Sequence, residues 1–116
     1  MTASTTFARD DLRTFNRQGQ AFDRGEIFSG VDFEAGLQAV EELRPLLPPN
    51  GTMAQMALRW ILMFEAVTCT IPGAKHPAQA KDNIRAADLS PLSDSTMENI
   101  RAIYDRHILP QVQQLW

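Results

Sequence analysis

The sequence contains very little cysteine. Cys69 is the only cysteine among 116 residues, so no disulfide can form within the chain. This excludes the small secreted folds that disulfides stabilise, and a single cysteine with apolar neighbours is typical of a buried thiol in a reducing compartment. We therefore expect Cys69 to be buried and the protein to be cytoplasmic.

A strong charge of one sign and a long apolar run are also missing. The 14 acidic and 11 basic residues are interspersed and give a net charge of -3, which argues against nucleic acid as a partner. The most apolar stretch, Met53–Ile71, contains Gln55, Arg59 and Glu65 and is too polar to span a bilayer. The N-terminus has neither the basic start nor the apolar core of a signal peptide. We expect no membrane association.

Residues 1–31 show no sustained apolar periodicity. They are rich in Arg, Asp, Gly, Ser and Thr, a composition that predicts a long loop, and loops of this length tend to be functional or disordered. Four scattered phenylalanines favour docking of this loop onto the folded part: Phe7, Phe15, Phe22 and Phe28.

Residues 32–116 form the folded part, and the spacing of apolar residues predicts four helices in it. The first begins with Asp32 as its N-cap and ends at the Pro48–Gly51 turn. The second opens at Thr52, with Gln55 completing a capping box. Apolar residues cover most of the circumference of this second helix, so we expect it to be buried on more than one side.

The third helix starts near Pro77, and Ser93 caps the fourth. The tail from Pro110 to Trp116 is expected to be extended. One clear strand is predicted at Val67–Ile71, which is short, β-branched and ended by Pro72 and Gly73. Its backbone groups need a partner strand from other polypeptide.

The segment from Thr70 to Asn83 carries the candidate binding chemistry. A helix N-terminus offers free amides and a partial positive charge, which favour an anion such as phosphate. Gly73 permits close approach to the backbone, Lys75 adds a full charge, and Gln79 and Asn83 lie on one helix face. This pattern predicts a nucleotide clamp. It also fits an ordinary strand-turn-helix connection in which Lys75 is a solvated loop residue.

The order of helix, strand, clamp and closing helix resembles the last βα unit of bacterial aldo/keto reductases. The resemblance is carried by Ala57–Leu62, Val67–Thr68, Ile71–Ala74, Gln79, Asn83, Ala86–Ala87 and Leu92–Ser93. It implies an α/β fold, in which the chain is the C-terminal fragment of a TIM (β/α)8 barrel. Locally this fragment is expected to be mostly α-helical with one clear strand.

The resemblance also implies a function. The family uses NADPH, or sometimes NADH, to reduce aldehydes and ketones, and the similar segment wraps the adenosine end of the cofactor. Gly73 and Ala74 would offer backbone contacts, Lys75 would pair with the 2′-phosphate, and Gln79 and Asn83 would contact the adenine side. The preference for NADP rests on Lys75 alone. His76 replaces the small polar residue that is often found there.

No part of the chain matches the motifs of the family's catalytic Asp, Tyr, Lys and His. We therefore predict no catalytic residue in this chain, no metal site, and no reductase activity by the chain alone. Tyr104 lies on an apolar stripe and is expected to pack, while His107 is expected to interact with the helix dipole at the end of its helix. The carbonyl substrate is not fixed by this segment.

The sequence also permits a second hypothesis, in which the chain is a stand-alone helical interaction or oligomerisation module. It would then act through apolar surfaces that a barrel otherwise covers. Under either reading the unpaired strand and the apolar second helix predict self-association of the chain.

Overall fold

The structure, a computed structural model, describes residues 6, 8–9, 11, 14 and 30–115. Most of the predicted loop 1–31, including its four phenylalanines, lies outside the described residues, so that interpretation stays a prediction. The chain divides into two units, one formed by residues 1–45 with 100–116 and the other by residues 46–99.

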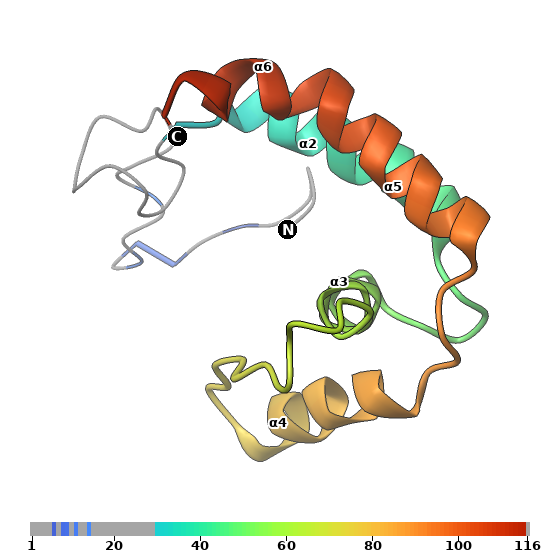
Figure 1. Cartoon of the computed structure of the whole chain (residues 1–116). Helices are drawn as coiled ribbons and strands as arrows, with labels where there is room; N and C mark the ends of the chain where they lie inside the picture. Colours follow the sequence, from blue (N-terminus) through green and yellow to red (C-terminus); the bar gives the residue numbers. More distant parts are fainter. Residues whose placement is uncertain (1–5, 7, 10, 12–13, 15–29, 116) are drawn as a thin grey trace. The chain divides into compact units, whose positions relative to one another are not determined.

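The first unit pairs helix α2 with the C-terminal helices. It contains α2 (Phe33–Leu43), the second part of α5 (Asp94–His107), α6 (Leu109–Val112) and the 3₁₀ helix η3 (Gln113–Leu115). The two ends of α2 are joined to α5 and α6 by side-chain hydrogen bonds, and Figure 1 shows these helices side by side. Ala39 and Ile103 are its buried apolar residues.

Local capping residues explain where α2 begins. The side chain of Asp32 accepts a hydrogen bond from the amide of Ala35 at 2.9 Å, which confirms the predicted N-cap. The predicted turn after this helix is also present. The 3₁₀ helix η1 (Arg44–Leu46) follows α2, Asn50 has a left-handed φ of 63°, and the Gly51 amide donates to Pro48 O at 2.9 Å.

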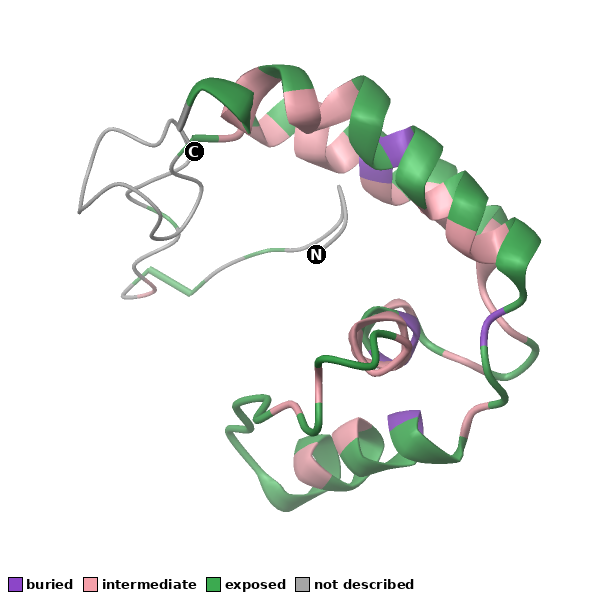
Figure 2. Ribbon diagram, in the orientation of Figure 1, coloured by how far each residue is buried: buried purple, intermediate pink, exposed green. Residues whose placement is uncertain are grey.

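The second unit contains α3 (Met53–Ile61), α4 (Pro77–Ile84) and the 3₁₀ helix η2 (Arg85–Asp88), followed by the first turns of α5. The predicted capping box is present, since Thr52 and Gln55 exchange hydrogen bonds at the start of α3. The second amide function of Gln55 donates to Asp82 O at 3.0 Å and joins α3 to α4. The buried residues of this unit are few, and Figure 2 draws such positions in purple: Gln55, Met56, Ala86 and Leu92.

Two expectations about regular structure are wrong. The described residues contain no strand, and Val67–Ile71 has no partner with which to form one. The tail is helical instead of extended, with α6 and η3 at residues 109–115. Helix α3 fully buries only Gln55 and Met56, but Ala54 and Ala57 are its only exposed residues and the others are half-buried, so it is covered on more than one side, as expected.

Cys69 is also not buried. It is exposed, because the extended segment around it is covered only partly by α3 and α4. Apolar flanking residues predicted burial, but burial depends on what packs over the segment from elsewhere.

Candidate functional site

The candidate clamp consists of residues 73–76 and the first two turns of α4. His76 is the N-cap of α4, in an extended conformation with φ −152° and ψ 161°. Its Nδ1 accepts a hydrogen bond from the amide of Gln79 at 3.2 Å, and its carbonyl accepts from Ala80 N at 3.3 Å. Pro77 then occupies the first helical position, as predicted, because its missing amide and fixed φ suit that position.

Two amide side chains of α4 hold the loop against the helix. Gln79 Oε1 accepts from the backbone amide of Lys75 at 2.8 Å, and Asn83 Nδ2 donates to Gly73 O at 3.2 Å. The structure therefore brings together the five residues singled out in the sequence: Gly73, Ala74, Lys75, Gln79 and Asn83. Among the described residues no hydrogen bond uses the Nε2 amide group of Gln79 or the Oδ1 acceptor of Asn83.

The clamp is open to a ligand. Residues 73–79 are exposed and Asn83 is half-buried. A Cβ built on Gly73 would meet nothing within 4 Å, so the described fold itself leaves the backbone at this glycine accessible. Lys75 makes no ion pair with any described residue, and its charge is thus available for an anion.

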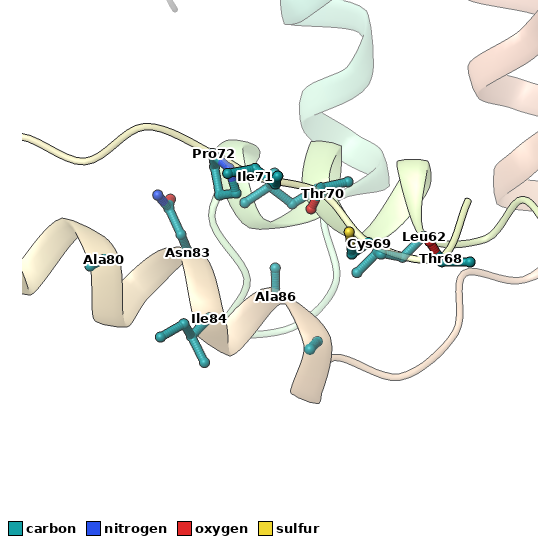
Figure 3. A pocket seen from close by; sticks show the side chains of 12 residues that line it. Leu62, Thr68, Cys69, Thr70, Ile71, Pro72, Ala80, Asn83, Ile84 and Ala86 are labelled. Atoms are coloured by element: carbon teal, nitrogen blue, oxygen red, sulfur yellow. The ribbon is translucent and has the colours of Figure 1, made fainter.

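A pocket of about 460 Å³ borders this clamp within the second unit. Its lining is largely apolar and comes from α3, residues 68–72, α4 and η2, with Leu58, Leu62, Ile71, Ile84, Ala86 and Ala87 among the side chains. Of the five residues singled out in the sequence, Asn83 lines it, and Figure 3 shows this side chain pointing from α4 toward Pro72. Such a lining suits apolar contacts, while the polar contacts lie at residues 73–79.

Tyr104 and His107, the other candidate residues, lie in the first unit. Tyr104 is 41% exposed, so it packs only in part. His107 is in the last turn of α5, as predicted, but it also contacts a carboxylate: its Nε2 lies 2.8 Å from Glu42 Oε1. Arg106 donates to the other oxygen of Glu42 at 2.7 Å. The hydrogen bond from His107, reinforced by the charge of Arg106, holds the pKa of Glu42 below its usual value.

One residue of the clamp, His76, was not assigned a role from the sequence. The local signal was present, since a side chain with a hydrogen-bond acceptor directly before a proline at a helix start is an N-cap pattern. Histidine is not among the preferred N-caps, so the sequence did not indicate that its ring nitrogen accepts the hydrogen bond that caps α4.

Within the described residues, no group of three or more His, Cys, Asp or Glu side chains could hold a metal ion. In the same part of the chain, every helix is too short or too polar to cross a bilayer.

Comparison with known sequences now decides the family. Residues 2–105 match the sequence pattern described as the Aldo/keto reductase family. The chain belongs to this family. The match includes α2, α3, the clamp and α4, and the family implies a TIM barrel.

Similar proteins are reductases by name. The chain is 38% identical over 84 residues to an L-glyceraldehyde 3-phosphate reductase of Escherichia coli O157:H7, an alignment covering 72% of this chain and 23% of that protein. It is 34% identical over 109 residues to an aldo/keto reductase of Synechocystis sp., covering 85% of this chain and 32% of that protein. No solved structure matches significantly.

The aligned region thus spans about a quarter to a third of these relatives, 23% and 32% of their lengths. The aldo/keto reductase family consists of oxidoreductases that bind nicotinamide dinucleotides.

Proposed function

We propose that residues 73–83 hold the adenosine end of a nicotinamide dinucleotide, with NADP preferred over NAD. The chain is then the C-terminal cofactor-binding part of an aldo/keto reductase barrel that reduces aldehydes or ketones. The observation that carries this proposal is the pairing of the loop with α4 through Gln79 and Asn83. This pairing fixes an exposed loop backbone next to two amide groups with unused hydrogen-bonding capacity.

The unused functions suit an adenine edge. Gln79 Nε2 can donate to a ring nitrogen, and Asn83 Oδ1 can accept from the exocyclic amine. The two residues lie four positions apart on one face of α4, so both can form hydrogen bonds with the same planar ring. The amide pair would thus recognise adenine at the cofactor's adenosine end.

Lys75 supplies the charge in this proposal. It precedes an eight-residue helix, whose N-terminus adds about half a positive charge, and it makes no ion pair with any described residue. A 2′-phosphate placed there would be attracted by both charges, whereas the 2′-hydroxyl of NAD would not. The bound cofactor itself supplies the hydride for reduction, and this chain's residues bind and orient it.

The experiment is a calorimetric titration of the chain with NADP⁺ and with NAD⁺. Lys75→Ala should weaken NADP⁺ binding about tenfold, because an exposed charge-assisted contact lies at the low end of roughly 1.5–3 kcal/mol. NAD⁺ binding should change little. Lys81→Ala is the matched control, because Lys81 is the other lysine of the chain and is exposed on α4. Equal losses for both dinucleotides in Lys75→Ala would show that Lys75 does not read the phosphate.

The proposal includes inactivity of the 116-residue chain by itself. Carbonyl reduction needs a proton donor beside the carbonyl, and no residue of this chain matches the family's catalytic set. NADPH oxidation with 4-nitrobenzaldehyde is expected to equal the buffer blank. Turnover from a preparation free of host reductases would contradict this expectation.

A further inference from the structure

The N-cap of α4 is a histidine in a role that only one charge state can perform. His76 Nδ1 lies 3.2 Å from the amide nitrogen of Gln79 and accepts its hydrogen bond. An imidazole nitrogen accepts only when it carries no proton, so this geometry requires the neutral ring with its proton on Nε2. In the protonated ring both nitrogens are donors, and Nδ1–H would face the N–H of Gln79.

The same glutamine controls the loop that precedes the helix. The backbone amide of Gln79 donates to His76 Nδ1, and the Gln79 side-chain Oε1 accepts from the amide of Lys75 at 2.8 Å. Two hydrogen bonds therefore link residues 75–76 to Gln79 in a closed ring. The bond from Asn83 to Gly73 O is independent of this ring. Loss of the His76 cap would loosen the position of Lys75 without removing the other contact.

We propose that His76 is a proton-sensitive positioning residue of the cofactor clamp. Neutral His76 caps α4 and fixes the loop, and protonation releases the cap and weakens dinucleotide binding. This inference rests on the proposed function, because it concerns the regulation of the same site. Histidine side chains change charge between about pH 5 and 8, whereas Ser, Thr and Asn caps do not titrate there.

The charged surroundings do not replace the cap. Helix α4 packs against α3 and η2. The charged residues on these elements and next to His76 are Arg59, Lys75, Lys81, Asp82, Arg85 and Asp88. None of them forms an ion pair with His76 within the described structure, and Asp82 is paired with Arg85 at 3.4 Å. No described carboxylate is therefore positioned to compensate for a protonated His76.

Protonation also adds a positive charge near the proposed phosphate position, and this effect has the opposite sign. The charge would favour NADP⁺ and leave NAD⁺ almost unchanged, whereas loss of the cap weakens both dinucleotides alike. Because His76 is exposed, the added charge is screened by solvent and amounts to less than the cap. The comparison of the two cofactors therefore separates the two effects.

The test is the dissociation constant of NADP⁺ and NAD⁺ at about pH 5.5 and about pH 8, for the chain and for His76→Asn. Asparagine is a good N-cap without a titrating group. The cofactor's own phosphate titrates equally with both proteins, so its effect drops out when the variant is compared with the unaltered chain. Acidification should weaken NAD⁺ binding about fivefold more in the unaltered chain than in the variant, and NADP⁺ binding by a smaller factor, because the charge of protonated His76 partly offsets the lost cap. His107→Gln, which alters the chain's other histidine, should keep the full pH effect.

A pH effect equal in the unaltered chain and His76→Asn would overturn the inference. So would tighter NADP⁺ binding at low pH in the unaltered chain alone, since His76 would then act as a phosphate ligand.

A second readout needs no cofactor. The backbone amide resonance of Gln79 should shift between about pH 8 and pH 5.5 in the unaltered chain and stay fixed in His76→Asn. An unmoved resonance in both proteins would show that His76 does not cap α4 in solution. If the resonance shifts as expected but neither protein binds a dinucleotide at about pH 8, the proposed function fails and the regulatory inference fails with it. The shift of the Gln79 resonance without cofactor would then show that His76 does cap α4 and that only the assignment of the cofactor site is wrong.

Discussion

Two glycines of this chain differ in what a methyl group would meet. A Cβ on Gly51 would lie 2.7 Å from Pro48 Cγ and 3.2 Å from Pro48 O, because the turn folds the chain back on itself there. A Cβ on Gly36, inside α2, would meet nothing within 4 Å. The same substitution should therefore have opposite effects at the two positions.

We expect Gly51→Ala to destabilise the fold by about 1–3 kcal/mol through the clash with a rigid proline ring. Gly36→Ala should stabilise it by about 1 kcal/mol, since alanine has the higher helix propensity. Chemical denaturation followed by helical circular dichroism measures both. A destabilised Gly36→Ala, or an unaffected Gly51→Ala, would mean that the local packing around these glycines differs from that described here.

The carboxylate of Glu42 on α2 contacts Arg106 and His107 on α5 and so joins the two helices. The hydrogen bond from His107 and the charge of Arg106 lower the pKa of Glu42 from its usual 4.5. A lowered pKa in the folded state means that the carboxylate stabilises the fold fully above about pH 4.5. This stabilisation is lost as the pH falls through the lower, folded-state pKa.

Glu42→Gln should consequently be less stable than the unaltered chain at neutral pH, with the difference shrinking as the pH falls below about 4.5. Urea denaturation at a series of pH values measures this difference. Glu98→Gln is the control, because Glu98 is exposed on α5 and forms no ion pair among the described residues. A constant difference at all pH values, or an equal effect in the control, would show that Glu42 does not join the helices.

The sequence predicts the starts of the helices better than it predicts the strand. Helix starts at Asp32, Thr52, Pro77 and Ser93 are predicted correctly, because capping involves residues only two or three positions apart. The Val67–Ile71 strand is not, because a strand requires a partner that no local pattern supplies. Burial of Cys69 fails for the same reason.

The candidate site divides in a similar way. The local order of Gly73, Lys75, Gln79 and Asn83 suggested a clamp, and the family resemblance gave each residue a role. The hydrogen bonds by which Gln79 and Asn83 hold the loop depend on the backbone path of residues 73–76. The sequence left that path open, and with it the capping role of His76.

For the whole molecule, the extent of exposed apolar surface favours self-association. Ile71 is 93% exposed, Ile84 70% and Phe64 44%, and all three belong to the second unit. Since large apolar side chains in contact with water favour association, we expect the 13.0 kDa chain to form dimers or larger species. Light scattering coupled to size exclusion at several concentrations tests this. A cooperatively melting monomer throughout the series would contradict it.

The same surface is what the alternative function would use. A helical interaction module would bind partners through Ile71 and Ile84 and would have no need of a dinucleotide. Self-association alone does not separate this alternative from the cofactor-binding proposal, because both predict it. The two are distinguished by whether a dinucleotide binds at residues 73–83.

Binding of a dinucleotide at residues 73–83 can be observed by NMR titration of the ¹⁵N-labelled chain with NADP⁺. We expect the backbone amides of Gly73, Ala74 and Lys75 and the side-chain amides of Gln79 and Asn83 to shift in a saturable manner. Residues around Glu42, in the other unit, should stay unchanged. Saturable shifts confined to other residues, or no shifts at all, would show that residues 73–83 do not bind the cofactor.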